Sequence, residues 1–165
     1  MKVAVLGAKG RMGAECVAAI NAASDLTLAA ALDLGDSLDQ LVSSGAEIVV
    51  DFTTPESVMK NLEFAINNGI HVVVGTTGID EGRLKQLKEL LSKKSGVGAL
   101  IAPNFGLGAV LMMQFSSTAA KYFESVEIVE MHHANKVDAP SGTAIRTAQM
   151  INDSRKQSGK GKMPD

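Results

Sequence analysis

A short apolar segment that leads directly into a glycine-rich loop constrains the fold of this chain more than any other feature. Residues 2–6 (KVAVL) are typical of a buried β-strand, and residues 7–13 (GAKGRMG) follow without a break. After the loop, Cys16, Val17 and Ile20 fall on one face of a predicted helix. Glycines let the backbone turn tightly at a helix start, where free N–H groups attract phosphate. The three features together predict a dinucleotide-binding unit, although the loop alone would also suit a turn with only a packing role.

An acidic residue at the end of the next predicted strand strengthens this interpretation. Residues 26–32 form that strand, and Asp33 follows it, twenty residues after Gly13. A carboxylate in this position accepts hydrogen bonds from the adenosine ribose, unless Asp33 merely opens a polar loop. Its charge favours NADH because it repels a 2′-phosphate, whereas Lys9 and Arg11 offer cations that pair with one.

Three more buried strands, at residues 47–52, 70–74 and 99–102, alternate with predicted helices. This order predicts an α/β fold with a Rossmann-like, doubly wound parallel sheet, in which ligands bind beyond the carboxyl ends of the strands. Thr53 and Glu56 match a capping box, so we expect a helix to start there. Small and hydroxyl residues recur after the strands, and although each group also suits an ordinary turn, their recurrence favours a cofactor site. The residues predicted to contact the dinucleotide are Gly7, Ala8, Lys9, Gly10, Arg11, Met12, Gly13, Asp33, Phe52, Thr53, Gly75, Thr76, Thr77, Ala102, Pro103, Asn104 and Phe105.

The second part of the chain has a different pattern, and we place the domain boundary at Gly106–Gly108. Residues 1–106 are predicted to form the dinucleotide-binding domain, and residues 107–165 the first part of an α+β substrate-binding and oligomerisation domain. Residues 126–131 are β-prone and predict a strand. Residues 152–165 are polar and lack apolar periodicity, so we expect a loop or a frayed end there.

Residues 130–144 (EMHHANKVDAPSGTA) concentrate side chains that carry chemistry. Ser141 or Thr143 is a suitable N-cap, and the N–H groups of such a helix start form an anion site. Lys136 adds a positive charge, and a histidine exchanges protons near neutral pH. Alternation along a strand sends neighbouring histidines to opposite faces, which argues against a shared metal ion. The stretch therefore suits the reduction or rearrangement of a small carboxylate, but a surface histidine pair and a solvated lysine are the alternative.

The same stretch resembles the signature of dihydrodipicolinate reductase, also called 4-hydroxy-tetrahydrodipicolinate reductase, and the resemblance extends into the amino-terminal region. It implies NAD(P)H-dependent reduction of a cyclic imine dicarboxylate in lysine and diaminopimelate biosynthesis, with NADH and NADPH both tolerated. We expect NADH to serve at least as well. The resemblance implies that His132 and Lys136 donate protons in catalysis. It also implies that the substrate carboxylates are held by His133, Lys136, Ser141, Gly142 and Thr143.

Members of that family are longer than this chain and form homotetramers, so the resemblance implies that a C-terminal part is lacking. Two alternatives to the reductase follow. One is a truncated, non-catalytic dinucleotide-binding or redox-sensing module. The other is a different nicotinamide oxidoreductase, such as a semialdehyde or homoserine dehydrogenase.

Composition restricts the partners that we expect. The 165 residues are 45% hydrophobic and 21% charged, with a net charge of −2, which indicates neither a nucleic-acid nor an anionic-membrane partner. No segment reads as a secretory signal or reaches the ~20 apolar residues of a membrane span. The single cysteine, Cys16, is predicted to be a packing residue. We therefore expect a cytoplasmic protein.

Overall fold

A computed structural model of the chain describes residues 1–102, 104–132, 134 and 139–161. These residues divide into two compact units, Met1–Ala102 and Pro103–Asp165. The division falls slightly before the predicted boundary at Gly106–Gly108. Asn104 lies in the second unit, where its side chain donates a hydrogen bond to Thr143.

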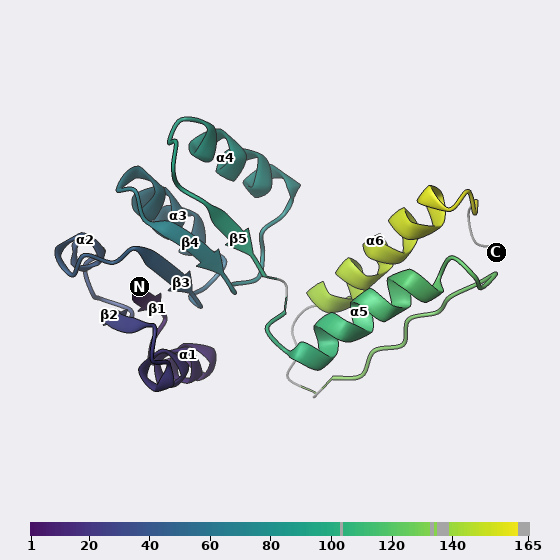
Figure 1. Cartoon of the computed structure of the whole chain (residues 1–165), viewed down its shortest axis with the longest axis horizontal. Helices are drawn as coiled ribbons and strands as arrows, with labels where there is room; N and C mark the ends of the chain where they lie inside the picture. Colours follow the sequence, from purple (N-terminus) through teal and green to yellow (C-terminus); the bar gives the residue numbers. More distant parts are fainter. Residues whose placement is uncertain (103, 133, 135–138, 162–165) are drawn as a thin grey trace. The chain divides into compact units, whose positions relative to one another are not determined.

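The first unit contains a five-stranded, fully parallel sheet with the strand order β2-β1-β3-β4-β5 (Figure 1). The strands are β1 (Lys2–Leu6), β2 (Thr27–Leu32), β3 (Ile48–Asp51), β4 (His71–Val74) and β5 (Ala99–Ile101). They are connected by the helices α1 (Arg11–Ala22), α2 (Asp39–Ser43), α3 (Val58–Asn67) and α4 (Glu81–Ser92). The prediction of a Rossmann-like α/β sheet is confirmed. The strand order reverses between β1 and β3, which is the switch point where ligands of such sheets bind.

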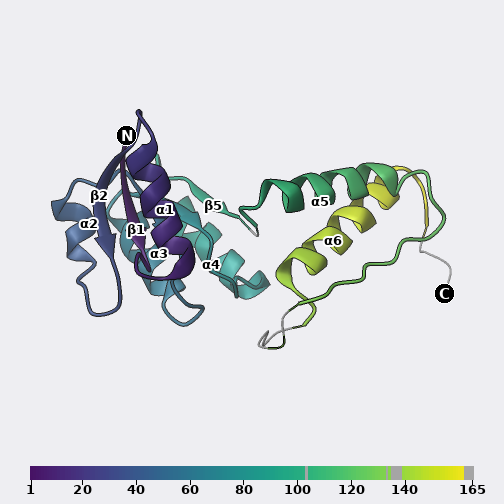
Figure 2. The same ribbon diagram turned by 90° about the horizontal axis from the view of Figure 1, so that it is seen from below.

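Helices cover both faces of this sheet, as Figures 1 and 2 show. The larger core lies beneath α2, α3 and α4, where Leu41, Leu62 and Ile66 are fully buried. A smaller core, which includes Val3, Val5 and Ile20, lies between the other face and α1. Alternation along β1 sends neighbouring side chains to these two cores, so both faces anchor the loops that follow the strands.

The predicted capping box at the start of α3 is wrong. The helix begins at Val58, and its N-cap Ser57 makes no capping hydrogen bond through its side chain. Thr53 lies four residues before that N-cap, and its hydroxyl donates to the Asp51 carboxylate at 2.6 Å and accepts from Asn61 Nδ2 at 3.3 Å. The turn between β3 and α3 is therefore organised by the end of the strand.

The second unit is built on two helices, α5 (Leu107–Ala119) and α6 (Gly142–Gln157), which lie side by side (Figures 1 and 2). Ser141 is the N-cap of α6, as predicted, and its hydroxyl accepts a hydrogen bond from Ala144 N–H. Near the other end of the pair, the Ser154 hydroxyl donates to the Ser117 carbonyl at 2.6 Å. Within the described parts of the chain, neither these helices nor the others are long and apolar enough to cross a membrane.

Two predictions for the second unit are wrong. Residues 126–131 form no strand, and among the described residues they pair with no other strand. Strand-forming residues need a neighbouring edge for their backbone hydrogen bonds, and this segment instead runs beside α6 (Figure 2). Residues 152–157 are not a loop but the last turns of α6. Arg155 stabilises them, since its guanidinium donates to carbonyl groups beyond the end of α5.

Candidate functional site

A cavity of about 490 Å³ opens at the switch point of the sheet, beyond the ends of β1, β2 and β3. This volume lies within the usual range for small-molecule and cofactor sites. Its lining combines the glycine loop (residues 7–13), the β2–α2 connection, the β3–α3 turn and one side of α3. The residues are Leu6, Gly7, Gly10, Leu32, Asp33, Leu34, Gly35, Asp36, Leu38, Phe52, Thr53, Thr54, Ser57, Lys60 and Asn61.

The glycine loop leaves no room for side chains at two positions. A Cβ atom on Gly13 would lie 2.0 Å from the Gly7 carbonyl oxygen. One on Gly7, whose φ is +74°, would lie 2.6 Å from the Phe52 carbonyl oxygen. Gly10 caps α1 without a side chain, which leaves the helix start accessible to a ligand. Glycines packed in this way suit the close approach of a pyrophosphate to backbone N–H groups, so the loop fits a dinucleotide.

Asp33 both orders its loop and faces the cavity. Its carboxylate accepts hydrogen bonds from Leu34 N–H at 2.8 Å and from Lys9 N–H at 2.6 Å. These bonds, the Leu34 bond first, hold the pKa of the Asp33 carboxyl below its usual value. A carboxylate has about four acceptor positions, so Asp33 keeps capacity for the hydroxyls of a ribose.

The other predicted cofactor residues in the first unit occupy the loop and the strand ends. Lys9, Arg11 and Met12 are exposed, and Ala8 donates its N–H to the Leu32 carbonyl. At the end of β4, Gly75 N–H donates to the Asp51 carbonyl and Thr76 is buried, whereas Thr77 is exposed. Ala102 N–H donates to the Val74 carbonyl at the end of β5. Among all the residues predicted to contact the dinucleotide in the first unit, those that line the cavity are Gly7, Gly10, Asp33, Phe52 and Thr53.

The sequence did not reveal the contribution of α3 to the cavity. Lys60 and Asn61 lie on the side of this helix that lines it. Their spacing carries no recognisable motif. They reach the cavity only because the turn after β3 sets the direction in which α3 leaves the sheet.

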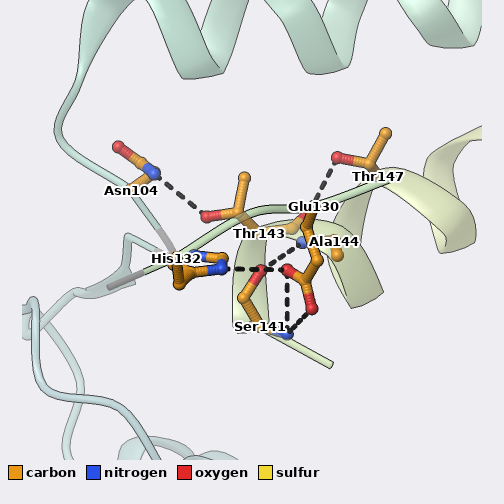
Figure 3. Close-up of polar contacts among 7 residues, drawn as sticks. All are labelled: Asn104, Glu130, His132, Ser141, Thr143, Ala144 and Thr147. Carbon is orange, nitrogen blue, oxygen red and sulfur yellow. Dashed lines mark hydrogen bonds and ion pairs between the residues drawn. The ribbon is translucent and has the colours of Figure 1, made fainter. Parts of the chain in front are cut away.

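A second polar cluster lies at the start of α6 in the second unit (Figure 3). The Glu130 carboxylate accepts the Ser141 N–H, at 2.9 Å and 3.2 Å to its two oxygens. The same carboxylate lies 3.8 Å from Nδ1 of His132. Glu130 therefore connects the predicted proton donor to the predicted anion site, a role that no sequence motif indicated to us.

The segment that precedes α5 is hydrogen-bonded to the start of α6 at Thr143. Its hydroxyl oxygen accepts a hydrogen bond from Asn104 Nδ2 at 3.0 Å, and Asn104 Oδ1 accepts the Gly106 N–H at 2.7 Å (Figure 3). A predicted cofactor residue thus contacts a predicted substrate residue. Phe105 is exposed. Pro103, His133 and Lys136, which the sequence also assigned to the site, lie outside the described residues.

The cluster also defines which groups at the helix start remain for a ligand. Ser141 uses its N–H for Glu130 and its hydroxyl for capping. The next two N–H groups, those of Gly142 and Thr143, are the first of the helix and lack intrahelical acceptors. An anion at this site would therefore use these two groups, with the helix dipole behind them.

Comparison with known protein families matches both units. Residues 1–105 match the family model "Dihydrodipicolinate reductase, N-terminus", and residues 108–164 match "Dihydrodipicolinate reductase, C-terminus". The chain belongs to the dihydrodipicolinate reductase family. Proteins named 4-hydroxy-tetrahydrodipicolinate reductase from Corynebacterium efficiens and Streptomyces avermitilis are 59% and 57% identical over the whole of this chain. The chain spans 66% of the length of each.

Solved structures give the same family and a broader fold class. A dipicolinate-bound dihydrodipicolinate reductase from Paenisporosarcina matches with a TM-score of 0.78 and 36% identity, over 94% of this chain and 66% of that one. A myo-inositol 2-dehydrogenase from Lactobacillus plantarum matches with a TM-score of 0.58 and 11% identity, over 74% of this chain and 42% of that one. The second likeness supports only the fold. The family's amino-terminal region is a dinucleotide-binding domain, which supports a nicotinamide cofactor.

Proposed function

We propose that this chain provides the cofactor domain and part of the substrate site of a 4-hydroxy-tetrahydrodipicolinate reductase. The reaction takes up a hydride and a proton and releases water, which converts the cyclic imine 4-hydroxy-tetrahydrodipicolinate into tetrahydrodipicolinate. The reaction belongs to lysine and diaminopimelate biosynthesis. The substrate is a small dicarboxylate, in keeping with the dipicolinate bound to the Paenisporosarcina relative.

One observation carries this proposal. The chain combines a switch-point cavity with a closely packed glycine loop and, in the second unit, the Glu130–His132–Ser141 cluster. Both regions fall within the matching family models. A dinucleotide-binding module without catalysis would need only the first region. Membership of this family also argues against a semialdehyde or homoserine dehydrogenase.

The first unit supplies the cofactor site in this proposal. The glycine loop holds the pyrophosphate, Asp33 accepts the ribose hydroxyls, and the turns after β3 and β4 contact the nicotinamide half. A bound NADH or NADPH supplies the hydride.

The second unit supplies the proton and the anion site. Glu130 lies on the Nδ1 side of His132, so we assign proton transfer to the other ring nitrogen, Nε2. The Glu130 carboxylate, 3.8 Å from Nδ1, helps to orient the ring in this proposal. Gly142 and Thr143 N–H groups hold one substrate carboxylate. The resemblance assigns a further cation and proton donor to Lys136, and a substrate contact to His133.

Both dinucleotides are expected to bind, with NADH at least as tightly as NADPH. Asp33 and Asp36 line the cavity, and their carboxylates disfavour a 2′-phosphate, whereas Lys60 contributes a cation to the same lining. Asp33→Asn should therefore shift the ratio of the two dissociation constants towards NADPH. A ratio that does not change would exclude Asp33 from the ribose site.

The function is tested by following NADH oxidation when the chain is mixed with the cyclic imine. His132→Gln should lower turnover by roughly 10²–10⁴ and leave the NADH dissociation constant unchanged, because general acid catalysis contributes about that factor. His71→Gln is the control, since His71 lies in β4 and accepts the Gly98 N–H. NADH binding without turnover in the unsubstituted chain would favour a non-catalytic binding module. Equal turnover in the His132 variant would reject His132 as the proton donor.

A further inference from the structure

A buried carboxylate without a basic partner lies beneath the proposed cofactor site. Asp51, the last residue of β3, is 0% exposed. Its Oδ1 accepts hydrogen bonds from Thr53 N–H at 2.8 Å, from the Thr53 hydroxyl at 2.6 Å and from the Thr76 hydroxyl at 2.7 Å. Its Oδ2 accepts from Asn61 Nδ2 at 2.9 Å. Among the residues that the structure describes, no basic side chain forms an ion pair with it.

Such a carboxylate is a costly way to fill a core. Moving a charged group out of water carries a penalty of several kcal/mol, which an apolar residue avoids. The neighbouring interior position on β3 is the apolar Val49, which is 1% exposed. Stability of the core therefore does not explain why a carboxylate occupies the end of the strand. Its hydrogen bonds define a local arrangement, because a fully satisfied polar network fixes the positions of its members.

The members of this network come from three segments that surround the cofactor site. Thr53 belongs to the turn after β3, Thr76 to the turn after β4 and Asn61 to α3. The Asp51 main-chain carbonyl also accepts hydrogen bonds from Gly75 N–H at 2.9 Å and from the Thr76 hydroxyl at 3.1 Å. The two turns are thus joined to one residue through both its side chain and its backbone.

The glycine loop depends on the same arrangement. Gly7 packs so closely on the Phe52 carbonyl that a Cβ atom there would lie at 2.6 Å. Phe52 lies between Asp51 and Thr53, and its N–H donates to the Leu6 carbonyl. A shift of the β3 turn would therefore displace the surface on which the glycine loop rests.

We propose that Asp51 is a positioning residue, which sets the turns after β3 and β4 so that they hold the nicotinamide dinucleotide, and which does not itself touch the cofactor. This inference rests on the proposed dinucleotide site. Asp51→Asn keeps the shape of the side chain but replaces one acceptor oxygen by a donor, which then faces a donor of the network. Thr76→Val removes the hydroxyl that bonds the Asp51 side chain and leaves the Gly75 N–H bond to the Asp51 carbonyl in place.

The first experiment measures NADH binding to the full chain by fluorescence titration. Each single variant should weaken NADH binding by about tenfold, the effect expected for the loss of one hydrogen bond to a charged group. The double variant should bind NADH no more weakly than Asp51→Asn alone, because the Thr76 hydroxyl acts through Asp51. Additive losses would overturn the connection through Thr76. Val49→Ala is the control for general destabilisation, and an equal loss of NADH binding in that variant would assign Asp51 a merely structural role.

A second measurement separates this inference from the proposed function. Hydrogen exchange in the absence of any ligand should become faster in residues 52–54 and 75–77 of the Asp51→Asn variant, with α4 unchanged. If both turns exchange faster but the unsubstituted chain binds no NADH, Asp51 positions the turns and the proposed function fails. If exchange in residues 75–77 is unchanged, the positioning role is overturned whether or not NADH binds.

Discussion

The two units of this chain are stabilised in different ways. The first unit buries an apolar core between a sheet and its helices, with Leu41, Leu62 and Ile66 fully excluded from solvent. In the described part of the second unit, the buried hydrophobic residues are Met113, Ala120 and Ile151. Phe115, in α5, is 65% exposed, and Tyr122, shortly after the end of α5, is 77% exposed.

Polar contacts replace apolar burial in the second unit. The Ser117 hydroxyl donates to the Met150 carbonyl, and the Ser154 hydroxyl donates to the Ser117 carbonyl. Arg155, 5% exposed, donates to the carbonyls of Ala120, Phe123 and Glu124. The comparison teaches that a close-packed core fixes the loops of the first unit, whereas hydrogen bonds hold together the helix pair that carries the proposed anion site. Substitutions in the two units should therefore have different consequences.

The largest effect is expected where the first unit is most tightly packed. Gly13→Ala places a Cβ atom 2.0 Å from the Gly7 carbonyl oxygen, so the loop must move. NADH binding should weaken by at least about 100-fold, because the pyrophosphate and the loop backbone no longer fit. Gly108→Ala is the matched change in the second unit, where nothing lies within 4 Å of the added atom. It should leave NADH binding unchanged and stabilise α5 by about 0.5–1 kcal/mol. Equal NADH affinities in the two variants would contradict the difference in packing.

The second effect concerns Arg155. Arg155→Met keeps the apolar stem but removes the hydrogen bonds to the end of α5, and should destabilise the second unit by about 2–4 kcal/mol. Hydrogen exchange should become faster along α5 and α6 and stay unchanged in the sheet. Lys156→Met is the matched control, because Lys156 is exposed at the next position of α6. Loss of protection in the sheet would show that the two units unfold together.

The sequence predicted the first unit well because its signals are local. Apolar runs marked the strands, and the glycines marked the sharp turn at Gly7 and the close contact at Gly13. The roles of Asp51 and Asn61 escaped prediction, since their meeting depends on the register of β3 and on the direction of α3. The capping box failed because α3 begins only at Val58, beyond both Thr53 and Glu56.

The second unit was harder to predict because its contacts are not local. Residues 126–131 have the composition of a strand but no neighbouring strand among the described residues. Ser154 and Arg155 are polar but buried, since their partners are carbonyls on or just beyond a helix that lies more than thirty residues earlier in the chain. Glu130 is part of the sequence motif at residues 130–144, but its contacts with both His132 and Ser141 become visible only in the structure.

The smallest effect concerns pH and Asp33. Hydrogen bonds lower the pKa of its carboxyl in the folded chain, so its contribution to stability is complete above the unfolded value of about 3.9. That contribution is lost as the pH falls through the lower, folded pKa. The melting temperature of the first unit should therefore fall in this acidic window, and Asp33→Asn should make the fall shallower. Asp25→Asn, an exposed acid in the α1–β2 connection, is the control. If Asp33→Asn leaves the dependence of the melting temperature on pH unchanged, the ionisation of Asp33 does not contribute to the stability of the first unit.

The central proposal is that the first unit binds the nicotinamide dinucleotide and that the second unit contributes to binding of the dicarboxylate substrate. The most direct test is a calorimetric titration of NADH into the chain, with and without pyridine-2,6-dicarboxylate. We predict that NADH binds alone and that the dicarboxylate tightens its binding by about 5-fold or more, the usual range for coupled sites. His132→Gln should reduce that coupling without weakening NADH alone. NADH binding that is identical with and without the dicarboxylate would contradict the claim.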